Sequence, residues 1–207
     1  MNETTAQTLL WTGIGFAAGS LMLAYWLGWL ALRRDVRQIG DGNPGATNVL
    51  KAGGWQIGAL ALLLDVLKGA IPVSIATYVV GLSGAPLALA ALAPVFGHAF
   101  SPFLRFKGGK AVAVSFGVWM ALTLWELPSF GGILLGVWFS LIAVSGWAVL
   151  MTFASLIAYL LIAHPDPVLI AVLAVNGALV AWKYRDDLRR FPQPRAWLAA
   201  RLKISEL

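Results

Sequence analysis

The sequence predicts an all-α membrane protein that crosses the bilayer about seven times, with its N-terminus outside and its C-terminus in the cytoplasm. The chain has 207 residues, of which 59% are apolar and only 12% are charged, whereas about 25% of an ordinary soluble domain is charged. The mean hydropathy is +0.80. Because about 20 apolar residues span a bilayer, six or seven spans fit. This composition excludes a soluble globule, a disordered chain and a secreted disulfide scaffold.

Apolar runs between helix breakers define the spans. The run Leu9–Leu32 is preceded by Glu3 and by no Lys or Arg, so we interpret it as one retained helix rather than a secretory signal, which begins with basic residues. The boundary near 148–150 depends only on Gly146 and a change in side-chain size, so six or eight spans stay open. The candidate spans are 8–32, 55–80, 85–101, 111–125, 130–148, 149–163 and 168–183.

The positions of the charged residues predict the orientation. With seven spans, every one of the 15 Lys and Arg residues except Lys68 falls in a cytoplasmic loop, at its edge or in the C-terminal tail. The segments expected outside hold Glu3, Glu126 and Asp166 but no basic residue, which is the positive-inside pattern. We therefore interpret the net charge of +6 as a topology signal and an attraction to anionic membrane lipids, and we expect no nucleic-acid partner.

The first of two unusual cytoplasmic loops, 33–51, has the composition of a phosphate-binding cradle. Its glycines let the backbone approach a ligand, and successive N–H groups in such bends bind anions. Thr47 and Asn48 are expected to begin a short helix whose N-terminus also favours an anion. Arg37 and Lys51 place positive charge on both sides. The alternative is a flexible basic linker, which the run after Asp41 disfavours. The glycines are Gly40, Gly42 and Gly45.

The second loop, 101–110, places two lysines around two glycines. Lys107 and Lys110 supply ammonium groups and Gly108 and Gly109 supply bare backbone, so together they can surround a phosphate. The alternative is an aromatic and basic anchor at the membrane interface, where such side chains are common. We expect both loops to face the same side of the membrane, which favours the phosphate-binding interpretation.

Other polar residues admit two interpretations. Asp65 and Lys68 are three residues apart inside an apolar span, so we expect them to pair and to face the bundle, as a structural or a functional pair. His98 lies at the inner end of the third span, where a hydrogen-bonded helix-end group is the ordinary role and a base is the alternative. We expect His164 to be inert. The chain has no cysteine and these two histidines only, which disfavours a metal centre.

The loop motifs resemble those of the bacterial acyl-phosphate:glycerol-3-phosphate acyltransferases, the PlsY family. The family signature G-S-G-N-x-G-A-T-N-V-x-R is similar to Gly40-Asp-Gly-Asn-Pro-Gly-Ala-Thr-Asn-Val-Leu-Lys51. The family's Asp-x-x-Lys-Gly is similar to Asp65-Val-Leu-Lys-Gly69, and its F-K-G-G-K is found at Phe106–Lys110, after Gly97-His98. The resemblance covers about residues 13–190, including the early Gly-Ser at Gly19-Ser20.

The resemblance implies a seven-helix bundle in the bacterial inner membrane with its active site at the cytoplasmic loops. It implies transfer of a fatty acyl group from acyl phosphate to the 1-hydroxyl of glycerol 3-phosphate, giving lysophosphatidic acid and phosphate, without a metal or other cofactor. We expect one membrane domain over 1–190 and a basic tail over 191–207. The implied catalytic residues are Lys110, Asp41, Asn48 and Thr47. The implied substrate-binding residues are Gly40, Gly42, Asn43, Gly45, Lys51, Arg37, Ser101, Lys107, Gly108, Gly109, His98, Asp187 and Ser20.

The sequence departs from the family pattern on the acceptor side. The family holds glycerol 3-phosphate with a Ser, an Arg, a Lys and an Asn, and the matching residues here are Asp41, Lys51, Lys110 and Asp187. Only Lys110 is kept, and two carboxylates stand where neutral groups serve an anionic substrate. Three accounts stay open: an ordinary acyltransferase whose acids are neutralised by neighbouring bases, a paralogue that acylates a neutral or cationic acceptor with Asp41 as general base, or a protein without catalysis. The other departures are Ala111, Val114 and Met22 in place of Gly, Thr and Pro.

Two interpretations come from other functional classes. A transporter would suit an intramembrane charged pair and glycine-rich backbone, but the polar motifs gather at one face rather than at the midplane, and no inverted repeat is visible. A membrane scaffold without catalysis would tolerate replacement of Lys110.

Overall fold

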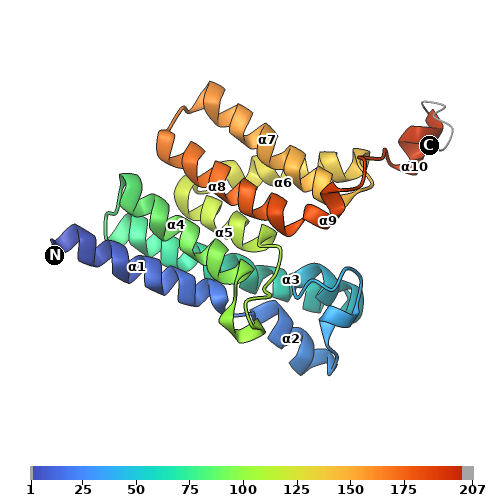
Figure 1. Ribbon diagram of the computed structural model, residues 1–207, viewed down its shortest axis with the longest axis horizontal. Coiled ribbons are helices and arrows are strands. Elements are labelled where there is room, and N and C mark those ends of the chain that lie inside the picture. The colour runs from blue at the N-terminus through green and yellow to red at the C-terminus, as the bar shows by residue number, and fades with distance from the viewer. Residues whose placement is uncertain (1, 202–207) are drawn as a thin grey trace. The chain divides into compact units, whose positions relative to one another are not determined.

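The computed structural model describes residues 2–201, which form helices joined by loops (Figure 1). The described residues divide into two compact units, one ending at Trp125 and the other beginning at Glu126. The first unit contains α1 (Glu3–Ser20), α2 (Leu23–Leu32), η1 (Val36–Gln38), α3 (Ala46–Ser74), η2 (Ile75–Val79), α4 (Gly84–Ala99), η3 (Pro102–Leu104) and α5 (Val112–Thr123). The second contains α6 (Glu126–Leu141), α7 (Ser145–Ala163), α8 (Pro167–Lys183), α9 (Arg185–Leu188) and α10 (Ala196–Arg201).

The apolar helices fall in the same parts of the chain as the predicted spans, with two exceptions described below. Within residues 2–201, four helical stretches are long and apolar enough to cross a membrane, namely 3–32, 46–79, 84–104 and 145–163. Shorter apolar helices cover 112–123, 126–141 and 167–183. The all-helical membrane fold is therefore confirmed, while the orientation in the bilayer stays a prediction from the charge pattern. The second predicted span is preceded by the expected short helix, because α3 begins at Ala46 and is interrupted at Gly54, where φ is +81°.

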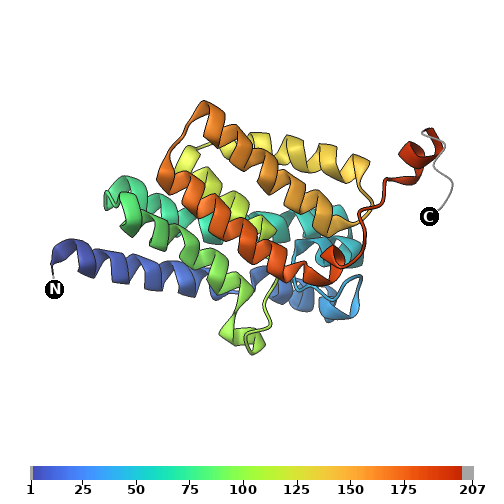
Figure 2. The same ribbon diagram turned by 45° about the horizontal axis from the view of Figure 1, so that its top comes forward.

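Close contacts between glycine-bearing helices hold the first unit together. Helix α1 packs along α4, and α3 packs along α5 (Figures 1 and 2). A Cβ atom on Gly19 would lie 2.1 Å from the Pro94 carbonyl oxygen, and one on Gly117 would lie 2.0 Å from that of Val66. Small residues allow such backbone approach in membrane bundles, where apolar burial between helices gives little drive.

The first predicted span is not one continuous helix, so the prediction of a single helix over Leu9–Leu32 was wrong. Helix α1 ends at Ser20 and α2 begins at Leu23. The break frees two carbonyl groups, and both find side-chain donors from distant elements. Lys68 Nζ donates to the Leu21 oxygen at 2.7 Å, and Ser101 Oγ donates to the Ser20 oxygen at 2.6 Å. These two bonds satisfy backbone carbonyl groups that have no helical hydrogen-bond partner because the helix is interrupted there.

The Asp65–Lys68 pair has a structural role at this break. Lys68 Nζ lies 2.8 Å from Asp65 Oδ1, and both side chains are buried, with 2% and 1% of their surface exposed. The Lys68 ammonium thus binds both the Asp65 carboxylate and the Leu21 carbonyl. Of the two interpretations for this pair, the contacts support the structural one.

In the second unit, α7 packs against α6, α8 and α9. The predicted boundary at 148–150 was wrong, because α6 ends at Leu141 and α7 begins at Ser145. The intervening residues pair with 193–195: Ala143 N donates to the Gln193 oxygen and Arg195 N to the Leu141 oxygen, both at 2.8 Å. This pairing holds the chain extended between the two helices.

Candidate functional site

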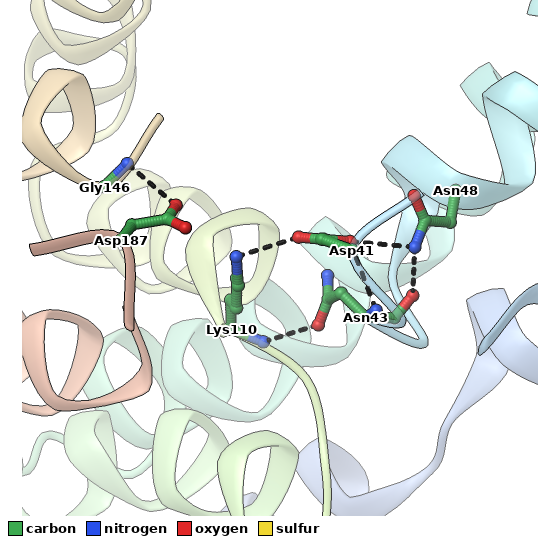
Figure 3. Close-up of polar contacts among 6 residues, drawn as sticks. All are labelled: Asp41, Asn43, Asn48, Lys110, Gly146 and Asp187. Atoms are coloured by element: carbon green, nitrogen blue, oxygen red, sulfur yellow. Dashed lines mark hydrogen bonds and ion pairs between the residues drawn. The ribbon is translucent and has the colours of Figure 1, made fainter. Parts of the chain in front are cut away.

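The two glycine-rich loops of the first unit meet at Lys110 (Figure 3). Lys110 Nζ lies 2.8 Å from Asp41 Oδ2, and the Lys110 backbone N–H donates to Asn43 Oδ1 at 3.0 Å. The side chain of Lys110 is 17% exposed and that of Asp41 is 48% exposed. A cation from one loop and a carboxylate from the other are thus joined at a surface that solutes can reach. We call Asp41, Asn43, Asn48 and Lys110 the loop cluster.

Asn48 fixes the shape of the first loop from the first turn of α3. Its buried Nδ2 donates to Asp41 Oδ1 and to the Asn43 carbonyl oxygen, each at 2.9 Å. Its Oδ1 is also buried and has no hydrogen-bond partner among residues 2–201. A Cβ atom on Gly40 would lie 2.5 Å from this oxygen and 2.9 Å from Lys51 Nζ. Gly40, at φ +60°, therefore brings Lys51 and Asn48 together in a space that a side chain would fill.

The Asp41 carboxyl is ionised at neutral pH. Partial burial acts to raise its pKa, but the hydrogen bond and charge of Lys110, with N–H groups of Asn43 and Asn48, outweigh burial and hold the pKa below 3.8. The stabilisation from this pairing is therefore complete above the ordinary pKa and is lost as the pH falls through the lowered folded value. A paired carboxylate of low pKa is a weak general base, which counts against that role for Asp41.

The second loop is fitted against the end of α4. Gly109 N donates to the His98 carbonyl oxygen at 3.1 Å. A Cβ atom on Gly108 would lie 1.9 Å from that oxygen, and one on Gly109 would lie 2.2 Å from His98 Nε2. Larger residues would push the loop off the helix and displace Lys110. The buried His98 thus supports the loop that carries Lys110.

The two predicted serines bind main-chain carbonyl groups. Ser101 Oγ donates to the Ser20 oxygen at 2.6 Å, and Ser20 Oγ donates to the Phe16 oxygen at 2.7 Å. Both serines are buried. Their hydrogen bonds connect the start of the second loop to the end of α1 and so hold that loop in position.

The remaining predicted residues of the first unit lie around the loop cluster. Thr47 and Lys51 are exposed on the first turns of α3, and Gly42 and Gly45 flank Asn43. Arg37 Nη2 lies 2.6 Å from Asp35 Oδ2 and its guanidinium lies over the Tyr25 ring. This bond raises the pKa of Arg37 and lowers that of Asp35. The structure does not place Arg37 or Lys107 in the loop cluster. They line a separate pocket of about 500 Å³, with Arg105, which the sequence did not single out.

Asp187 belongs to the second unit, where it caps a helix. Its Oδ2 accepts a hydrogen bond from Gly146 N at 3.1 Å, in the first turn of α7 (Figure 3). A carboxylate is favourable there because it meets unpaired N–H groups and the positive end of the helix dipole. Charge alone could not reveal this role. Within residues 2–201, no group of three or more His, Asp or Glu side chains is arranged to hold a metal ion.

The sequence matches a protein-family model described as glycerol-3-phosphate acyltransferase over residues 9–193. It is 36% identical over 197 residues to the glycerol-3-phosphate acyltransferase of Anaeromyxobacter sp. (strain Fw109-5), covering 92% of this chain and 95% of the relative. It is 37% identical over 171 residues to glycerol-3-phosphate acyltransferase 1 of Thermotoga maritima, covering 76% of this chain and 84% of that protein.

Two solved structures share the fold. A crystal structure of PlsY, an integral membrane glycerol 3-phosphate acyltransferase, in its glycerol 3-phosphate form superposes with a TM-score of 0.78 at 28% identity, covering 96% of this chain and 99% of that one. The lysophosphatidic acid form gives a TM-score of 0.78 at 30% identity, covering 88% and 90%.

Proposed function

The chain belongs to the glycerol-3-phosphate acyltransferase family, and from that premise we propose that it acylates glycerol 3-phosphate in phospholipid synthesis. The acyl donor is acyl phosphate, and the site is the loop cluster on the cytoplasmic face of the bacterial inner membrane. The 1-hydroxyl oxygen of glycerol 3-phosphate attacks the acyl carbonyl carbon and forms an ester. The bond from that carbon to the phosphate oxygen breaks, and the hydroxyl proton leaves with phosphate. The products are lysophosphatidic acid and inorganic phosphate.

The contact between Lys110 and the first loop carries this proposal. Lys110 lies 2.8 Å from Asp41 and its backbone bonds to Asn43, so one cation serves both glycine-rich loops. A substrate phosphate can replace the Asp41 carboxylate as the partner of the ammonium, in a charge-assisted hydrogen bond. Loop N–H groups then stabilise the charge that develops on the carbonyl oxygen during attack.

The two unusual acids are compatible with an anionic acceptor. Asp41 is neutralised by Lys110, and the Asp187 carboxylate is engaged at the N-terminus of α7. Because both carboxylates have partners, neither leaves an uncompensated negative charge beside an anionic acceptor. This favours acylation of glycerol 3-phosphate over loss of catalysis. One observation favours a second candidate, a paralogue with a neutral acceptor, because a substrate phosphate must displace Asp41 before it can bind Lys110.

Phosphate release from palmitoyl phosphate tests both candidates. Purified protein is assayed with glycerol 3-phosphate, with glycerol as the matched neutral acceptor, and without an acceptor, and the lipid products are identified by mass. We expect phosphate release that requires glycerol 3-phosphate, with lysophosphatidic acid formed. Turnover with glycerol alone would support the second candidate, and liposome solute flux without acyl transfer would support a transporter instead.

Removing the Asp41 charge is expected to strengthen glycerol 3-phosphate binding. Replacement by the isosteric Asn, or by the family-like Ser, removes the charge of Asp41 from the Lys110 ammonium and removes a like charge next to the substrate phosphate. A loss of repulsion of about 1–2 kcal/mol predicts a KM lower by roughly 5- to 30-fold, with a smaller change in kcat. Steady-state kinetics measure KM and kcat separately. Asp186→Asn, which removes an exposed acid paired with Arg189, is the control, and an unchanged or higher KM in the Asp41 variants would contradict the expectation.

A further inference from the structure

The pocket beside the loop cluster is built from the inner end of the first span and both loops. Its volume is about 500 Å³. Tyr25 and Trp26 come from α2, and the other lining residues come from the loops. The lining residues are Tyr25, Trp26, Arg37, Phe103, Leu104, Arg105 and Lys107. No member of the loop cluster lines it, so it is a site of its own.

The pocket carries an excess of positive charge. Three cations line it, and the nearby carboxylate of Asp35 is bound bidentately by Arg37, whose Nε donates to Oδ1 and whose Nη2 donates to Oδ2. The side chains of Arg105 and Lys107 form no hydrogen bond or ion pair with any residue in the described range 2–201. Two cations therefore remain to bind an anion, and an arginine guanidinium offers a fork of donors that matches phosphate oxygens.

The pocket has aromatic side chains in its lining, and exposed apolar side chains flank the lining residues along the chain. The rings of Trp26 and Phe103 pack edge to face, with their centroids 5.4 Å apart, and this contact joins α2 to the second loop. Large apolar side chains that lie within a few residues of the lining residues along the chain are exposed: Trp29 is 58%, Leu30 72% and Phe106 65% exposed. Aromatic and basic side chains occur together where a membrane span meets the headgroup layer. A ligand that fits is an amphiphile, with an anionic end between the cations and a chain along the exposed apolar side chains.

We propose that this pocket binds the phosphate group of an anionic amphiphile, and that its resident ligand is an anionic phospholipid of the surrounding bilayer. Arg105 and Lys107 bind the phosphate, Arg37 completes the cationic rim, and Trp26 and Phe103 flank the glycerol and the first part of the chain. Single-chain phosphates share this chemistry and are the other source of ligand. The pocket gives a specific location to the lipid attraction that the net charge of +6 predicts for the whole molecule.

Native mass spectrometry of the full chain, released from nanodiscs, tests the proposal. Nanodiscs containing equal amounts of phosphatidylglycerol and phosphatidylcholine are the first arm, and detergent-solubilised protein titrated with dodecyl phosphate is the second. The variant is Arg105→Glu. The control is Arg34→Glu, which reverses an exposed charge in the adjacent loop but does not line the pocket. One juxtamembrane cation changes lipid affinity about fivefold, and a reversal changes the charge by two units, so it is expected to lower phosphatidylglycerol retention about 25-fold.

Retention of phosphatidylglycerol by the native protein and the control, but not by Arg105→Glu, supports the bilayer lipid as ligand. Loss of dodecyl phosphate binding in that variant, without phosphatidylglycerol selectivity in the native protein, overturns the phospholipid assignment and identifies a single-chain phosphate. Equal effects of the Arg105 and Arg34 variants in both arms overturn the pocket as a site. The readout is binding, so it is independent of the acyltransferase assay.

Discussion

Replacing Lys110 by alanine is expected to lower kcat/KM for glycerol 3-phosphate by about 10²- to 10³-fold, the usual cost of removing one group that stabilises the charge of a transition state. The ammonium is the link between the two loops, at 2.8 Å from Asp41. Its loss removes a charge-assisted bond to phosphate and leaves the Asp41 carboxylate without this counterion. Substrate binding and the chemical step should both suffer, so kcat falls and KM rises. Coupled phosphate-release kinetics over a range of both substrates measure the two constants.

Two comparisons separate this role from folding. Arg34→Ala removes an exposed cation from the preceding loop and should leave kcat/KM within about twofold, because isolated surface charges contribute little. The Lys110→Ala, Asp41→Ala double variant should be more active than Lys110→Ala alone, since the unpaired carboxylate is gone, and that non-additivity is the signature of coupled residues. Normal turnover by well-folded Lys110→Ala protein would contradict the site assignment.

The sequence was sufficient to locate most of the apolar segments and to predict that the two loops face the same side of the membrane. Long uncharged runs are local features, so the third, fourth and seventh predicted spans lie within a few residues of α4, α5 and α8. The second predicted span, 55–80, corresponds to the part of α3 that follows the interruption at Gly54, together with η2. The expectation that both loops face one side depended on the basic residues within them. The contacts of Lys110 with Asp41 and Asn43 agree with that expectation.

Features set by contacts between distant residues could not be found in this way. At the break after Ser20, the carbonyl of Leu21 accepts a hydrogen bond from Lys68, 47 positions along the chain. The carbonyl of Ser20 accepts one from Ser101, 81 positions along the chain. The end of α6 is fixed by pairing with residues 193–195, and the start of α7 is capped by Asp187. The substrate-binding roles of Asp187 and Ser101 stay predictions. The fold adds that Asp187 accepts a hydrogen bond at a helix N-terminus and that Ser101 donates one to a main-chain carbonyl.

Replacing Lys68 by methionine is expected to destabilise the protein by about 3–5 kcal/mol, the cost of leaving one member of a buried ion pair unpaired. The substitution keeps the length of the side chain but removes the ammonium. The Asp65 carboxylate, 1% exposed, is then buried without its cation, and the Leu21 carbonyl loses its donor at the helix break. Reversible unfolding in mixed micelles measures the change. Leu67→Met, at an exposed position one residue away in α3, is the control and should cost less than about 1.5 kcal/mol.

The double variant Asp65→Leu, Lys68→Met distinguishes the two bonds of Lys68. Replacing both charges by apolar groups removes the buried unpaired carboxylate, so the double variant should recover most of the stability lost in Lys68→Met. A double variant as unstable as Lys68→Met would mean that the bond to the Leu21 carbonyl, rather than the charge pair, holds the break. Because Ser101 binds the adjacent Ser20 carbonyl, relaxation of the break would also displace the second loop. Stability and kcat/KM should therefore fall together in Lys68→Met and recover together in the double variant if the charge pair supports the second loop and that loop carries the proposed site.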